Sequence, residues 1–256
     1  MRFRAAIFAT LVIASWTAGR GAGQPINCAT VDAALNAALN AGYRGLSTNA
    51  YAQAAPGLSR AAVLFSACPR QTNREDEAMH RQVLAGVLWH IGERDASYRQ
   101  LRALKSLNET APFHIMISSQ SANAFAGGDF RRGYELFRAA LISPVYPDYV
   151  GLPVGLEDSG AATAIREALG DGTLGRYSLA LTRANLALQD DRGSQTTRLV
   201  AGVANLSAGH VQRARDLLFD ALLGFDANPD PHGRLTVMSL TAAYVLLALH
   251  DRPMAR

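Results

Sequence analysis

Lysine, cysteine and long hydrophobic runs are scarce in this chain of 256 residues. Lysine occurs once, at Lys105, and no block of basic residues marks a nucleic acid or an anionic membrane surface as the partner. Strand-like alternation of β-branched residues is almost absent. Alanine accounts for 46 residues instead, and apolar side chains recur at helical spacing, as between Val83 and Ile91. We therefore expect an all-α protein.

Residues 1–23 have the layout of a cleavable secretory signal. Arg2 and Arg4 precede a twelve-residue apolar run (5–16), and small residues follow it. The run is too short to span a bilayer. Removing the segment takes away three arginines and lowers the formal charge from +4 to +1. We expect a periplasmic or secreted protein with no transmembrane segment.

The two cysteines, Cys28 and Cys68, fall in an N-terminal region (24–72) that we expect to form a helical cap. An even number of cysteines in an exported chain favours a disulfide. A bond between Cys28 and Cys68 would close a loop of roughly 40 residues and would stabilise the fold by about 4 kcal/mol. The alternatives are two buried free thiols or a metal pair, but two cysteines without a nearby histidine pair make a poor zinc site.

Two segments, 123–141 and 202–222, share one pattern around a turn glycine, Gly128 or Gly209. A small residue lies five positions after the glycine, a large apolar residue nine after it, and an Ala-Leu pair 12 and 13 after it. The pattern is that of a helix, a glycine turn and a second helix with small residues inside it.

The spacing of the turn glycines indicates an insertion. A weaker copy of the pattern spans 81–104, and its Gly92 lies 36 residues before Gly128, whereas Gly209 lies 81 residues after Gly128. Two repeats of about 34 residues would need roughly 68, so about 13 residues are extra. The Pro/Gly/Tyr-rich stretch 143–160 supplies them and supports no long helix.

These segments resemble the tetratricopeptide repeat family. Residues 128–130 are similar to its inter-helix turn, and Gly202 and Ala214 match the facing small residues that let two helices cross closely. The resemblance implies a right-handed superhelix of antiparallel helix pairs. It places such pairs at 73–142 and again at 161–256, where the first copy is degenerate and a capping helix ends the array.

The resemblance also implies a partner-binding groove lined by the first helix of each pair. Trp89, Phe125 and Leu206 each lie three residues before a turn glycine and would form an apolar stripe. Such a stripe suits an extended or helical peptide. It equally suits packing against neighbouring helices or the 143–160 stretch. The implied groove residues are Met79, Gln82, Trp89, His90, Ser118, Phe125, Thr196, Leu199 and Leu206.

Two motifs could indicate chemistry, and we assign none to either. Residues 170–175 spell GxGxxG, but a helix rather than a strand precedes them, so we predict a turn between two helices. Glu77 and His80 match one half of a di-iron element whose second half is missing. We expect no catalytic residues, no metal and no cofactor.

The sequence therefore favours a non-catalytic, exported helical-repeat scaffold that mediates protein–protein interaction in the cell envelope. The partner protein or peptide is not identified by any motif, and no nucleic acid is expected. The alternative is an enzyme or small-ligand-binding protein whose site lies between the groove and the 143–160 stretch, with Tyr146, Tyr149 and Glu157 as its candidate residues.

Overall fold

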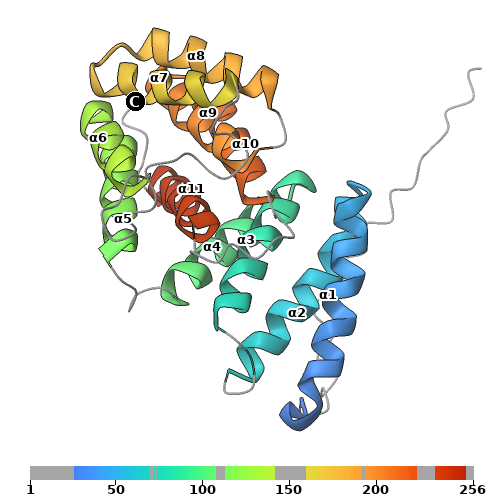
Figure 1. Ribbon diagram of the computed structural model, residues 1–256. Helices are drawn as coiled ribbons and strands as arrows, with labels where there is room; N and C mark the ends of the chain where they lie inside the picture. Colours follow the sequence, from blue (N-terminus) through green and yellow to red (C-terminus); the bar gives the residue numbers. More distant parts are fainter. Residues whose placement is uncertain are drawn as a thin grey trace, which may run out of the picture.

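The computed structural model describes residues 26–69, 72, 74–107, 113–141, 160–191, 194–223 and 234–251 (Figure 1). These residues form helices only, which confirms the all-α prediction. The helices are η1 (Cys28–Thr30), α1 (Val31–Ser47), α2 (Tyr51–Ala67), α3 (Arg74–His90), α4 (Arg94–Leu107), α5 (Phe113–Ala126), α6 (Phe130–Leu141), α7 (Gly160–Thr173), α8 (Tyr177–Asp190), α9 (Gln195–Ser207), α10 (Val211–Leu223) and α11 (Arg234–Asp251). Within the described ranges, no helix is both long and apolar enough to cross a membrane.

Consecutive helices pack as antiparallel pairs: α1 with α2, α3 with α4, α5 with α6, α7 with α8, and α9 with α10. In four pairs the turn contains a glycine with a φ between 76° and 85°: Gly92, Gly128, Gly175 and Gly209. Each glycine N–H donates to the carbonyl three residues before it, and the next N–H donates to the carbonyl five residues before itself. These two bonds are the Schellman ending of a helix, which needs a left-handed residue. The turns predicted at Gly92, Gly128 and Gly209 are confirmed.

Gly175 shows where the extra residues between Gly128 and Gly209 lie. It lies 34 residues before Gly209 and 47 after Gly128, so the extra residues fall between α6 and α7. The GxGxxG motif at 170–175 covers the last turn of α7 and the residues 174–175 that lead to α8, so only its end forms the predicted turn between two helices. Residues 142–159, which hold nearly all of the predicted insertion, lie outside the described residues.

The α1–α2 pair uses the same turn with an asparagine at the left-handed position. Asn49 has a φ of 54°, its N–H donates to the Leu46 carbonyl, and the Ala50 N–H donates to the Gly45 carbonyl. Asparagine tolerates this conformation better than other residues with a side chain. The N-terminal region is therefore a fifth helix pair with the same turn geometry, a relation that the glycine pattern did not reveal.

We expect the same substitution to have opposite effects at two glycines. Gly209→Ala should lower the free energy of unfolding by about 1 kcal/mol, because alanine strains the left-handed turn even though no atom obstructs its Cβ. Gly170→Ala should raise it by about 0.5–1 kcal/mol, since Gly170 lies inside α7 with open space around it. Urea denaturation followed by circular dichroism measures both, and equal changes at the two positions would contradict this account.

The C-terminal helices α10 and α11 pack against helices from the first half of the chain. Helix α10 packs against α3, and α11 lies at the centre of the molecule, against α5 and α10 and also against α3, α4 and α9 (Figure 1). One hydrophobic cluster joins residues of α3–α10 to the segment 242–247 of α11. All seven residues from Thr241 to Leu247 are buried, as expected for a helix surrounded on every side. The final helix is thus a central core element rather than a cap at one end of the array.

The α1–α2 hairpin stands at one edge of the molecule and meets the rest mainly through α2 and α3 (Figure 1). It has its own small core, which includes Val31, Leu64 and Phe65. A disulfide between Cys28 and Cys68 ties its open end, with the two Cα atoms 5.5 Å apart. This pairing was predicted from the sequence, and the structure confirms it.

Candidate functional site

The residues predicted to line a groove lie on the first helices of three pairs. Met79, Gln82, Trp89 and His90 are on α3, Ser118 and Phe125 on α5, and Thr196, Leu199 and Leu206 on α9. The side chains of Gln82, Trp89, Phe125, Thr196, Leu199 and Leu206 are buried, whereas Met79 is half-buried and His90 is exposed. The side chain of Ser118 lies outside the described part of the structure.

The protein's own C-terminal helix takes up the space that the groove prediction left open. Trp89, Phe125, Leu199 and Leu206 belong to the same hydrophobic cluster as residues 242–247 of α11. The apolar stripe is therefore part of the core in this structure. The predicted groove residues lie on the first helices of three pairs, but no sequence pattern indicates where α11 lies.

Polar contacts hold α3 against α10 beside this core. The indole N–H of Trp89 donates to Oδ1 of Asp216 at 3.2 Å, and its ring stacks on Phe219 with 4.0 Å between centroids. His90 Nε2 lies 2.8 Å from Oδ1 of Asp220, with both side chains about one-third exposed. His90 and Asp220 lie 130 positions apart in the sequence, so no local motif indicates this pair.

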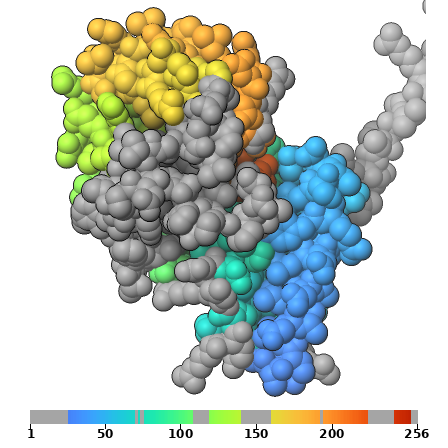
Figure 2. Space-filling model, in the orientation of Figure 1, coloured from blue at the N-terminus to red at the C-terminus, as the bar shows by residue number. Residues whose placement is uncertain are grey.

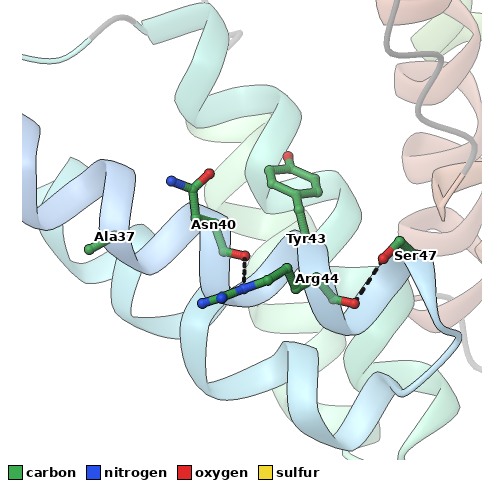
Figure 3. Close-up of a pocket in the computed structure, with 5 residues that line it drawn as sticks. All are labelled: Ala37, Asn40, Tyr43, Arg44 and Ser47. Carbon is green, nitrogen blue, oxygen red and sulfur yellow. Dashed lines mark hydrogen bonds between the residues drawn. The ribbon is translucent and has the colours of Figure 1, made fainter.

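An open hollow of about 620 Å³ lies on the hairpin, and its described lining comes from α1 (Figure 3). Helical spacing places Ala37, Asn40, Arg44 and Ser47 along one side of α1, and Tyr43 lies beside them. Nε of Arg44 donates to the backbone carbonyl of Asn40, and the Ser47 hydroxyl donates to the carbonyl of Arg44. Among the described residues no carboxylate pairs with Arg44, so its remaining N–H groups can donate to a bound molecule.

Tyr43, which lines the hollow, also contacts α3. The hydroxyl of Tyr43 is hydrogen-bonded to Nδ1 of His80, whose ring also packs against Phe65 of α2 with 5.4 Å between centroids. Burial lowers the pKa of His80 to about 4. Burial also raises the pKa of Tyr43, and the nearby Asp76 adds to this rise. His80 is therefore a neutral imidazole and Tyr43 a neutral phenol at pH 7.

The neighbouring polar residues of α3 are paired with one another and with α4. Glu77 Oε1 accepts from Nε of Arg81 at 2.8 Å, and both side chains are buried. Arg81 Nη1 donates to Oε1 of Gln100 at 2.8 Å. Glu77 and His80 thus have protein partners. Among the described residues no three histidine, cysteine, aspartate or glutamate side chains come close enough to hold a metal ion.

Two predicted features lie outside the residues that the structure describes. The alternative site with Tyr146, Tyr149 and Glu157 lies outside the described residues, as does the predicted signal at 1–23. No family model, curated protein or solved structure matches the chain.

Proposed function

We propose that this protein is an exported, non-catalytic scaffold of tetratricopeptide-like helix pairs that binds a partner protein in the cell envelope. The repeated turn supports the family resemblance, because five helix pairs end their first helix with the same two hydrogen bonds. The disulfide supports export, since such bonds persist in oxidising compartments. We infer that a right-handed array of these pairs has curved until α10 meets α3.

The observation that carries the proposal is the hairpin at the edge of the molecule. Because α11 fills the interior, a partner must meet the outer surface. The outer surface of α1 is open along one edge of the molecule (Figure 2), and the 44 residues 26–69 contain only three charged side chains: Asp32, Arg44 and Arg60. Low charge reduces the desolvation that an interface must overcome.

The hollow defines the chemistry of the contact. Arg44 offers its outer N–H groups, and Asn40 offers a side-chain amide, so the hollow suits a polypeptide segment that presents carbonyl or carboxylate oxygens. Ala37 leaves room for such a segment to approach the helix. We assign the centre of the partner interface to these three residues.

Photo-cross-linking from α1 tests this assignment. A benzoylphenylalanine at exposed Ala41 should give one defined adduct with an envelope protein at pH 7, and the same group at exposed Thr182 on α8 should not give it. The double variant Asn40→Ala with Arg44→Ala should lower the adduct yield about tenfold, the effect of losing one or two hydrogen bonds.

Arg60→Ala provides the matched control, because Arg60 is an exposed arginine of α2 that does not line the hollow. Its adduct yield should equal that of the unchanged protein. The same adduct from Ala41 and Thr182, or no adduct from Ala41, would contradict the proposed scaffold surface. If the adduct yield is unchanged in the Asn40→Ala, Arg44→Ala variant, the hollow is not part of the partner-binding surface.

A further inference from the structure

The contact between the hairpin and α3 is apolar at one end and polar at the other. Near the α1–α2 turn, Leu58 of α2 packs with Leu84 and Val87 of α3 in one hydrophobic cluster. Near the disulfide end, α3 turns Glu77, His80 and Arg81 toward the hairpin, and each is at most 7% exposed. Buried polar contacts depend on charge state in a way that apolar packing does not.

Two of these three polar side chains neutralise each other. Glu77 and Arg81 form an ion pair at 2.7 Å, and Arg81 also donates from Nη2 to the carbonyl of Ala62 in α2 at 3.4 Å. His80 is different, because no described carboxylate pairs with it. Its described contacts are the Tyr43 hydroxyl and the rings of Tyr43 and Phe65.

The Tyr43 hydroxyl and Nδ1 of His80 are hydrogen-bonded, and either atom can donate to the other. Protonation of the imidazole leaves this bond possible, but it places a cation in a buried site with no described carboxylate partner. Burial is what lowers the pKa of this histidine to about 4. Protonation therefore favours any conformation in which His80 reaches water.

Among the described residues, the other charged or titratable groups around His80 come from two helices. Along α3 they are Asp76, Glu77 and Arg81, and on α1 they are Tyr43 and Arg44, whereas α2 contributes the uncharged ring of Phe65. Glu77 is held by Arg81, and Asp76 is exposed and screened by water. The buried site therefore stays unfavourable for the cation.

The hairpin can move as one body. Its two helices are joined by the disulfide at one end and packed at close range along their length, with a Cβ built on Gly57 only 2.6 Å from the amide nitrogen of Gly42. Loss of the His80 contact would therefore separate the hairpin from α3 sooner than it would separate α1 from α2.

We propose that acid opens the disulfide end of the hairpin away from α3 through protonation of His80. The closed form holds a neutral histidine with a lowered pKa, and the open form holds one with an ordinary pKa near 6.5. Closed-state stability is thus complete above about pH 6.5 and is lost as the pH falls from 6.5 toward 4. The open population should rise about a hundredfold between pH 7 and pH 4.

Hydrogen exchange of the mature, disulfide-bonded protein at pH 7 and pH 4 tests this inference. After correction for intrinsic exchange rates, amides of 60–67 and 76–81 should lose about a hundredfold in protection, and amides of α9 should keep theirs. His80→Gln retains a hydrogen-bonding side chain that cannot be protonated, so it should abolish the difference. His210→Gln, at an exposed histidine, should leave the difference unchanged.

A direct titration keeps the inference falsifiable if His80→Gln fails to fold. An imidazole NMR signal of His80 that titrates near pH 6.5 in the unchanged protein would overturn the proposal. Unchanged protection at pH 4, or equal loss in His80→Gln, would also overturn it. These outcomes leave the scaffold proposal intact, because its cross-linking test is performed at pH 7.

Discussion

Removal of the Cys28–Cys68 disulfide is expected to lower the free energy of unfolding by about 4 kcal/mol. The bond joins residues separated by 40 positions, and its loss returns conformational freedom to the unfolded chain. The hairpin depends on this constraint because its own core is small and includes buried Cys68 beside Leu64 and Phe65. Urea denaturation of the Cys28→Ala, Cys68→Ala protein measures the loss, and alanine avoids placing a hydroxyl in the core.

A reductant separates the effect of the bond from that of the substitutions. The unchanged protein should shift to the midpoint of the double variant when it is reduced, and the double variant should not shift. If mass spectrometry shows both thiols free while the midpoint stays constant, the disulfide does not stabilise the hairpin.

Gly57→Ala is expected to cost about 3 kcal/mol, near the upper end of overpacking effects. The added Cβ would lie 2.6 Å from the backbone nitrogen of Gly42 and 2.7 Å from the carbonyl oxygen of Ala38. Backbone atoms cannot rotate aside as side chains do, so the two helix axes must separate. That movement exposes Leu58, which is 1% exposed in the intact hairpin. Thermal unfolding followed by circular dichroism gives the change.

Gly42→Ala provides the closest comparison, because its Cβ meets chiefly the flexible side chain of Leu58 at 2.7 Å. We expect a smaller loss there, about 1 kcal/mol. Gly170→Ala controls for the general effect of alanine in a helix. A Gly57→Ala protein as stable as the Gly42→Ala protein would show that the helices are not held at contact distance.

The sequence predicts the helices and their turns better than it predicts how the helices are arranged in space. A glycine followed by helical spacing marks a Schellman turn because few other residues accept a positive φ, and this identified Gly92, Gly128 and Gly209. Asn49 occupies the same position in the α1–α2 turn, but asparagine is common in many loop conformations. The glycine pattern therefore predicts no helix pair before 73, and only a helical cap is expected there.

The position of α11 could not be predicted from its pattern. Residues 241–247 show no polar face, which indicates burial but does not identify the neighbouring helices. Trp89, Phe125 and Leu206 lie on the first helices of their pairs, yet their exposure depends on whether another element covers them. The same limit applies to His80, because its environment comes from Tyr43 and Phe65 on separate helices.

The closure of α10 onto α3 has a consequence for how the chain is made. An open repeat array can fold from any point, one unit at a time. Here Trp89 bonds to Asp216 across 127 positions, and Arg102 pairs with Asp251 across 149. The apolar surfaces of α3 and α5 therefore stay uncovered until the last helix has been synthesised. Late completion of the core would leave the chain short of its full stability until synthesis ends, which suits the export that we propose.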